Sequence, residues 1–312
     1  MKTHLLILDS LAEEYRKALE PEFPDLVIRA CKTESEVGDF IEKATILLAF
    51  GISDELIRKA VNLEWIQALG TGVDSILGLS SLPRNVLLTS TRGIHGPQMS
   101  ELAMLLMLAL TRRFPDTVRN QDKAFWDRWP GELLWRKKVG ILGLGAVGEE
   151  IARKCKAFGM TVYGINRSKK QGDAVDRFFE LDGLLPVARE VDFLIVVVPL
   201  TPQTRGMVGA EVISAMKPSA YLLNLARGPV VDEKALIQAL ESGTLAGAGL
   251  DVFNEEPLPP GHPFWKMKNV IVTPHVGGTS AFYVRQVLSI FEENLRRYLR
   301  GKRHTLINRV EH

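Results

Sequence analysis

Short apolar runs alternate with longer stretches of helical periodicity along the whole chain. In the first third, the apolar runs are Leu5–Leu8, Leu26–Ile28, Ile46–Ala49, Trp65–Ala68 and Val86–Leu88. The helical patterns between them are Leu11–Leu19, Glu34–Lys43 and Asp54–Val61. Ser53 is a typical N-cap residue for the last of these helices. This alternation predicts βαβ units and therefore a parallel sheet.

A second series of apolar runs begins near Val139. Its members are Val139–Leu142, Thr161–Ile165, Phe193–Val198, Ala220–Leu225, Gly247–Leu250 and Val270–Thr273. The run Phe193–Val198 is apolar at every position, which is typical of a strand that is covered on both faces. Strands of this kind with helical spacers predict a doubly wound sheet. We therefore expect an α/β protein with two doubly wound parallel-sheet domains.

Composition and charge exclude several classes of protein. The 312 residues suit about two domains, and a net charge of +2 argues against a nucleic-acid binder. The two cysteines, Cys31 and Cys155, lack Cys or His companions, so we expect neither a disulfide scaffold nor a metal site. The longest apolar run, Leu102–Leu110, is shorter than the ~20 residues of a membrane span. The run at Leu5–Leu8 is too short for a secretory signal, which predicts a cytoplasmic protein.

A glycine motif follows the first strand of the second series. It reads Gly143-Leu144-Gly145-Ala146-Val147-Gly148 and leads into a helical pattern. A G-x-G-x-x-G between a strand and a helix is typical of a dinucleotide site. Gly143 permits the tight turn, Gly145 lets the backbone approach the pyrophosphate, and Gly148 lets the helix pack on the strand. The free N–H groups at the start of the helix attract the anion.

The end of the next strand indicates which dinucleotide binds. NAD sites commonly carry an acidic residue there, which binds the ribose hydroxyls. This chain has Asn166 instead, followed by Arg167 and Ser168. No carboxylate would repel a 2′-phosphate, and an arginine fork suits phosphate geometry. We therefore predict that NADP is preferred. The alternative is NAD, with Asn166 accepting its ribose and Arg167, Lys169 and Lys170 forming a solvated turn.

Reactive side chains follow the last three strands of the second series, where ligands bind in a doubly wound sheet. They are Arg227, Asp251, the adjacent pair Glu255 and Glu256, and His275. Arginine binds carboxylates, and histidine donates protons near neutral pH. A carboxylate beside the histidine stabilises the imidazolium, although the pattern does not choose between the two glutamates. The set suits hydride transfer from a nicotinamide to a 2-keto acid. The alternatives are a surface arginine and a structural histidine.

Of the six histidines, only His275 falls at a predicted strand end of the second sheet. His95 and His262 fall in predicted loops, which sets them aside as candidates.

The second half of the chain resembles the D-isomer-specific 2-hydroxyacid dehydrogenase family. Besides the glycine motif, the matching segments are Val198–Gly206, Asn224–Gly228, Val231–Glu233, Gly249–Phe253, Glu256–Pro259 and Pro274–Gly278. The motifs occur in order at family-like spacing, and the resemblance covers essentially the whole chain.

The resemblance implies a role for each matching residue. Arg227 would bind the substrate, His275 would be the general acid, and Glu256, which precedes Pro257, would pair with it. Asp251 would lie near the nicotinamide carboxamide. The other implied cofactor contacts are Leu200, Thr201, Leu225, Ala226, Arg227, His275 and Gly277. A loop in the first domain would hold the substrate carboxylate on its backbone amides, together with Arg227 and His275. Its residues are Leu69, Gly70, Thr71 and Gly72.

The resemblance also implies an architecture and a reaction. A Rossmann cofactor domain, residues 101–283, would be inserted in a flavodoxin-like substrate domain, residues 1–100 and 284–312. Similar proteins dimerise through the segment after residue 100, so we expect a homodimer. The Asn166-Arg167-Ser168 sequence resembles that of NADP-using glyoxylate and hydroxypyruvate reductases. We therefore expect reduction of a small 2-keto acid to the D-2-hydroxy acid by NAD(P)H.

Two alternatives share this fold. A dinucleotide-sensing binding protein, like the corepressors of the same fold, would carry the same catalytic residues. Formate dehydrogenases carry glutamine where Glu256 stands, which disfavours that activity. The side-chain specificity for the substrate is left open. The candidates for the pocket are Phe50, Leu69, Met99 and a tryptophan of the segment Gln121–Trp135.

Overall fold

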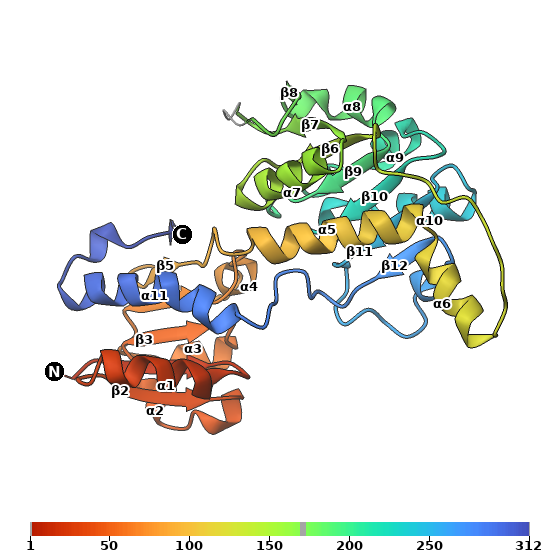
Figure 1. Ribbon diagram of the computed structural model, residues 1–312. Coiled ribbons are helices and arrows are strands. Elements are labelled where there is room, and N and C mark those ends of the chain that lie inside the picture. The colour runs from red at the N-terminus through yellow and green to blue at the C-terminus, as the bar shows by residue number, and fades with distance from the viewer. Residues whose placement is uncertain (1, 169–172, 312) are drawn as a thin grey trace. The chain divides into compact units, whose positions relative to one another are not determined.

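The computed structural model describes residues 2–168 and 173–311, so Lys169 and Lys170 lie outside the described residues. The chain forms two compact units, Met1–Ile94 with Ser280–His312, and His95–Thr279 (Figure 1). The divisions therefore fall after Ile94 and after Thr279, a few residues from the sequence-based boundaries at 100 and 284. Both units are α/β, and their sheets are parallel apart from one edge strand.

In the first unit, the described residues form a six-stranded sheet in the order β13-β5-β4-β3-β1-β2. The strands are β1 (His4–Leu8), β2 (Val27–Cys31), β3 (Ile46–Ala49), β4 (Trp65–Ala68), β5 (Leu87–Thr89) and β13 (Arg309–Val310). Only β13 is antiparallel to its neighbour. All residues of β3 and β4 are buried, because helices cover both faces of the sheet.

The helices of the first unit enclose two apolar cores. They are α1 (Ala12–Glu22), α2 (Phe40–Lys43), α3 (Asp54–Lys59), α4 (Asp74–Leu77) and α11 (Tyr283–Leu299). One core packs α1 and α11 on the sheet, and the other packs α2, α3 and α4. The Ser53 hydroxyl accepts a hydrogen bond from the Leu56 N–H at 3.2 Å, which confirms the predicted cap. The helix predicted over Glu34–Lys43 is wrong, because Gly38 adopts a left-handed φ of 55° and leaves only α2 and a short turn.

In the second unit, the described residues form a seven-stranded parallel sheet in the order β12-β11-β10-β9-β6-β7-β8. The strands are β6 (Lys138–Leu142), β7 (Thr161–Ile165), β8 (Arg177–Phe179), β9 (Phe193–Val196), β10 (Tyr221–Asn224), β11 (Gly247–Leu250) and β12 (Val270–Val272). After β8 the chain returns to the other side of β6. The order of strands therefore reverses between β6 and β9, which is where doubly wound sheets bind their ligands.

Helices cover both faces of this sheet (Figure 1). They are α5 (Gly96–Thr111), α6 (Phe114–Asp122), α7 (Ala146–Ala157), α8 (Leu184–Glu190), α9 (Ala210–Ala215) and α10 (Glu233–Glu241). α5 and α7 contribute to one core, and α8, α9 and α10 contribute to the other. In the part of the chain that the structure describes, none of the helices is both long enough and apolar enough for a bilayer span.

Candidate active site

The glycine turn joins β6 to α7 at the reversal of strand order. Gly143 has a φ of 106°, in the left-handed region, and its N–H donates to the Ile165 carbonyl at 2.8 Å. A Cβ on Gly148 would overlap the Gly143 carbonyl oxygen, so α7 packs on the turn only because residue 148 is glycine. Gly143 and Gly148 thus each meet a steric demand of this turn.

The start of α7 is open to a ligand. A Cβ placed on Gly145 would have no heavy atom of the described residues within 4 Å. Among those residues, no side chain caps α7 at its N-cap, Gly145. The first N–H groups of a helix lack partners within the helix and carry a partial positive charge. Open space and N–H groups therefore coincide, and the turn fits a dinucleotide pyrophosphate.

Asn166 links the end of β7 to the glycine turn. Its side-chain oxygen lies 3.5 Å from the Leu144 N–H, and its amide group donates to the Ser168 carbonyl at 3.0 Å. Arg167 and Ser168 are exposed. The strand end therefore presents an amide, a guanidinium and a hydroxyl where many dinucleotide sites present a carboxylate.

Arg227 follows β10 in a turn that is built by Asn224. The Asn224 side chain accepts from the Ala226 N–H and donates to the Arg227 carbonyl, both at 3.1 Å. The Arg227 guanidinium is partly buried and donates to the Ala226 carbonyl at 2.8 Å. A Cβ on Gly228 would overlap the backbone of Phe253, so glycine allows this turn to approach the segment after β11.

Glu256 and His275 form a hydrogen-bonded pair. His275 Nδ1 lies 2.7 Å from Glu256 Oε2, and Glu256 Oε1 accepts from the Phe253 N–H at 2.9 Å. One carboxylate oxygen of Glu256 is therefore held by the backbone while the other contacts the imidazole. Glu255 is exposed, and the glutamate that pairs with His275 is its neighbour Glu256. The pair uses Nδ1, so Nε2 is the imidazole nitrogen that remains for another partner.

Asp251 anchors the loop that carries His275. The carboxylate is only 1% exposed and accepts from the Thr273 hydroxyl at 2.5 Å, the Val276 N–H at 3.0 Å and the Gly277 N–H at 2.9 Å. The His275 N–H also donates to the Asp251 carbonyl at 2.9 Å. Asp251 therefore holds the residues on both sides of His275, a structural task that the sequence did not indicate.

The remaining predicted cofactor residues also follow strands of this sheet. Leu200 and Thr201 come after β9, and Leu225 and Ala226 come directly after β10. Because the strands are parallel, their carboxyl ends meet at one edge, together with the glycine turn, Arg227 and His275. The loop Leu69–Gly72 follows β4 and belongs to the first unit.

His95 is a second imidazole near Arg227 that sequence reasoning set aside. It lies at the N-cap of α5, is 8% exposed, and its Cδ2 lies 3.3 Å from the position of a Cβ on Gly278. Burial, with a smaller contribution from the Arg227 charge, lowers the pKa of His95 to about 4. His95 is therefore neutral near pH 7. The signal that could have found it was its position directly before an apolar helix, which predicts burial.

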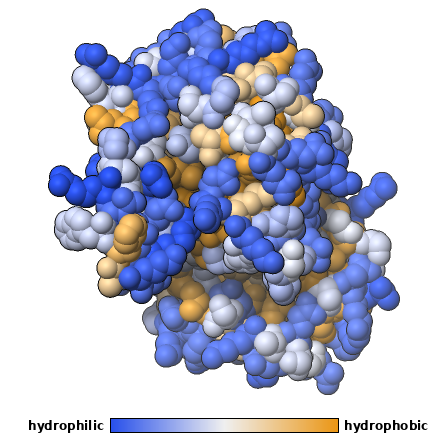
Figure 2. All heavy atoms as spheres, turned by 90° about the vertical axis from the view of Figure 1, so that its right-hand side faces the viewer, coloured by the Kyte–Doolittle hydropathy of each residue, from blue (hydrophilic) through white to orange (hydrophobic). Residues whose placement is uncertain are grey.

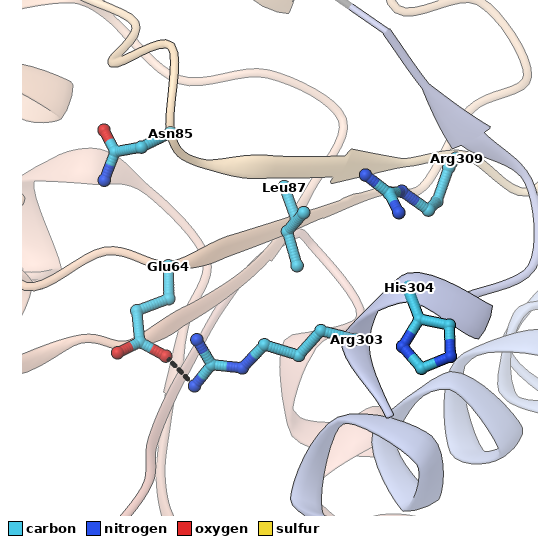
Figure 3. Close-up of a pocket in the computed structure, with 6 residues that line it drawn as sticks. All are labelled: Glu64, Asn85, Leu87, Arg303, His304 and Arg309. Carbon is cyan, nitrogen blue, oxygen red and sulfur yellow. Dashed lines mark hydrogen bonds and ion pairs between the residues drawn. The ribbon is translucent and has the colours of Figure 1, made fainter. Parts of the chain in front are cut away.

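The pocket in the first unit holds none of the predicted site residues. It has a volume of about 320 Å³ and is lined by Glu64, Asn85, Leu87, Arg303, His304 and Arg309 (Figure 3). Arg303 and Glu64 form an ion pair at 2.5 Å across it. Within the described ranges, 2–168 and 173–311, no group of three or more acidic, His or Cys residues could hold a metal ion.

Comparison with known proteins identifies the family. Residues 104–277 match the model of the D-isomer specific 2-hydroxyacid dehydrogenase NAD binding domain. The chain is 33% identical to a glyoxylate reductase of Pyrococcus furiosus over 99% of this chain and 96% of that protein. It is 34% identical to a D-3-phosphoglycerate dehydrogenase of Methanocaldococcus jannaschii over 96% of this chain, but spans only 58% of that relative.

Solved structures agree with this assignment. An NADPH-dependent glyoxylate/hydroxypyruvate reductase of Sinorhizobium meliloti, solved with NADP and sulfate, superposes with a TM-score of 0.88. The two proteins are 30% identical, and 99% of this chain and 98% of the other are covered. The chain belongs to the D-isomer-specific 2-hydroxyacid dehydrogenase family. The predictions that it is an α/β protein with two parallel-sheet domains and a dehydrogenase of this family are therefore confirmed.

Proposed function

We propose that this protein reduces a small 2-keto acid of the glyoxylate or hydroxypyruvate type to the D-2-hydroxy acid, with NADPH as the hydride donor. The observation that carries the proposal is the 2.7 Å pair of His275 and Glu256 at the same sheet edge as Arg227 and the glycine turn. Relatives from Pyrococcus furiosus and Sinorhizobium meliloti that bear glyoxylate reductase names support the substrate class.

Each reacting group has a residue suited to it. The Arg227 guanidinium binds the substrate carboxylate and orients the keto group. When the cofactor is bound, its reduced nicotinamide supplies the hydride. His275 donates the proton on Nε2 to the oxygen that becomes the hydroxyl. Glu256 stabilises the imidazolium before transfer and orients the ring through Nδ1. One hydride and one proton convert the keto acid into the hydroxy acid.

The first unit contributes the loop Leu69–Gly72 to this proposal. A turn with glycines at 70 and 72 can present successive backbone N–H groups to an anion. We propose that these N–H groups bind the substrate carboxylate.

Replacing Glu256 with glutamine is expected to lower kcat/KM for keto-acid reduction about 10- to 100-fold, because the His275 ring loses a charged hydrogen-bond partner. Reduction consumes a proton from His275, and the neutral amide stabilises the imidazolium less than the carboxylate does. The measurement is kcat/KM for glyoxylate between pH 5 and 9.

Glu255→Gln is the matched control, because it removes the same charge from the exposed neighbour. A profile for Glu256→Gln that coincides with those of the wild type and the control would show that Glu256 does not support His275.

The cofactor proposal predicts a higher kcat/KM with NADPH than with NADH. Replacing Arg167 with glutamine is expected to raise KM for NADPH about 10- to 100-fold, because a charge-assisted hydrogen bond to the 2′-phosphate is lost. KM for NADH should change little. Arg153→Gln, on the exposed face of α7, is the control and should leave both values unchanged. A wild type that prefers NADH would overturn this proposal.

We also propose that the protein is a cytoplasmic homodimer. Helix α5 and the segment after it expose large apolar side chains, among them Trp126 at 90% exposure. The others include Leu105, Phe114, Phe125, Leu133 and Trp135. Figure 2 views the side on which α6 lies in Figure 1 and shows apolar patches between hydrophilic surface. Aromatic surface of this kind is typical of interfaces. Both cysteines are unpaired and buried, which suits a reducing compartment.

A further inference from the structure

Two buried hydroxyls hold the carbonyl at the start of the loop Leu69–Gly72. The Tyr283 hydroxyl, from the first turn of α11, donates to the Leu69 oxygen at 2.6 Å. The Thr91 hydroxyl, from the segment after β5, donates to the same oxygen at 2.5 Å. Tyr283 is 6% exposed and Thr91 is fully buried. Two elements distant in sequence therefore converge on one peptide group.

The next carbonyl of the loop is held by the same residue. The Thr91 N–H donates to the Gly70 oxygen at 3.2 Å. Successive carbonyls along an extended strand point to opposite sides. Here the carbonyls of Leu69 and Gly70 both point toward Thr91, so the chain leaves the strand conformation at this point.

The directions of the N–H groups follow from peptide geometry. The peptide bonds of this loop are trans, and in a planar trans peptide the N–H points opposite to the carbonyl. The N–H groups of Gly70 and Thr71 therefore share one direction, away from Thr91. Two successive N–H groups on one side form a concavity of the kind that binds an anion.

The Tyr283 ring supports the same loop through a second contact. It stacks on Phe50 with ring centroids 5.8 Å apart and an interplanar angle of 18°. Phe50 Cδ1 in turn lies 3.7 Å from the position of a Cβ on Gly70. Burial raises the pKa of the Tyr283 hydroxyl well above its usual range, so it remains a donor. Removing only the Tyr283 hydroxyl would abolish the hydrogen bond to Leu69 and keep the ring contact with Phe50.

We propose that Tyr283 and Thr91 are positioning residues that turn the N–H groups of Gly70 and Thr71 toward the carboxylate of the substrate. This inference rests on the proposed 2-keto acid reductase function. It assigns the last helix of the chain a part in substrate recognition, through one hydroxyl group.

The test compares Tyr283→Phe with Tyr298→Phe. Tyr298 is a matched control, because it lies on the same helix, is equally buried, and donates its hydroxyl to Glu64 instead. KM for glyoxylate and Ki for oxalate, an anion that competes for the same carboxylate site, are measured with the intact protein. Tyr283→Phe should raise both about fivefold to tenfold, as expected for one lost neutral hydrogen bond. KM for NADPH and kcat should stay within about twofold, and Tyr298→Phe should resemble the wild type.

Thr91 provides a second, independent pair of variants. Thr91→Val removes the other hydroxyl and should raise the same two constants, whereas Thr91→Ser retains the hydroxyl and should restore them. This pair keeps the proposal testable if Tyr283→Phe fails to fold.

Three results would count against the inference. If Tyr283→Phe and Tyr298→Phe behave alike, or if Tyr283→Phe changes KM for NADPH as much as KM for glyoxylate, the hydroxyl does not position the loop. If Thr91→Ser is as impaired as Thr91→Val, volume and not the hydrogen bond matters. A wild type that turns over no 2-keto acid would instead overturn the proposed function itself.

Discussion

Replacing His275 with alanine is expected to lower kcat for 2-keto acid reduction by about 10²- to 10⁴-fold, the usual contribution of a positioned general acid. The His275 imidazole pairs with Glu256 through Nδ1, and in the proposed function Nε2 carries the proton that is donated. KM for NADPH should change much less than kcat. The measurement is the loss of NADPH absorbance with saturating glyoxylate.

We do not expect His95 to replace His275 as the proton donor. Its pKa of about 4 leaves the His95 imidazole neutral near pH 7, so it lacks the extra proton that an imidazolium would donate. His304→Ala, an exposed histidine of the first unit, is the control and should leave kcat unchanged. Retention of more than a tenth of the wild-type kcat in His275→Ala would show that another group donates the proton.

Replacing Arg227 with alanine is expected to lower kcat/KM for the keto acid by about 10²- to 10³-fold, because the substrate carboxylate loses a charged, two-pronged partner. Arg227→Lys keeps the charge but not the planar fork, so it should recover only part of the loss. The Arg227 side chain is partly buried and already oriented by the Ala226 carbonyl, so it loses little conformational entropy when it binds the substrate. Steady-state kinetics with glyoxylate measure the effect.

Arg189→Ala, an exposed arginine on α8, is the control for Arg227. Equal losses in the two variants would mean that net charge, and not a specific contact, governs activity. A wild type that binds NADPH tightly but reduces no 2-keto acid would contradict both predictions and would favour the dinucleotide-sensing alternative.

The order of elements was readable from the sequence because buried strands are short apolar runs and their helices have a different period. The strands that were missed are the short ones at the sheet edges. β8 and β13 begin with arginine and have three and two residues, so they carry no apolar run to recognise. The prediction of one helix over Glu34–Lys43 was wrong because Gly38 adopts a left-handed conformation, which interrupts the helix.

The candidate site was predictable where local chemistry decides it. The glycine turn and the Asn166-Arg167-Ser168 strand end are contiguous segments. Their residue types are enough to predict a dinucleotide site. The choice between Glu255 and Glu256 was open from the pattern alone and rested on the family resemblance, because adjacent residues share the same periodicity. In the structure Glu256 alone of the two bonds the Phe253 N–H and the His275 ring.

The sequence alone predicts two parallel-sheet domains, a dinucleotide turn, a resemblance to the dehydrogenase family and a short set of candidate reactive residues. These follow from periodicity and residue type, which are properties of neighbouring positions. Three features are visible only in the folded chain. Asp251 holds the His275 loop, His95 is buried within the influence of the Arg227 charge, and the Tyr283 hydroxyl donates to a carbonyl more than 200 residues away. Hydrogen bonds and desolvation act between residues that folding brings together, so no local pattern records them.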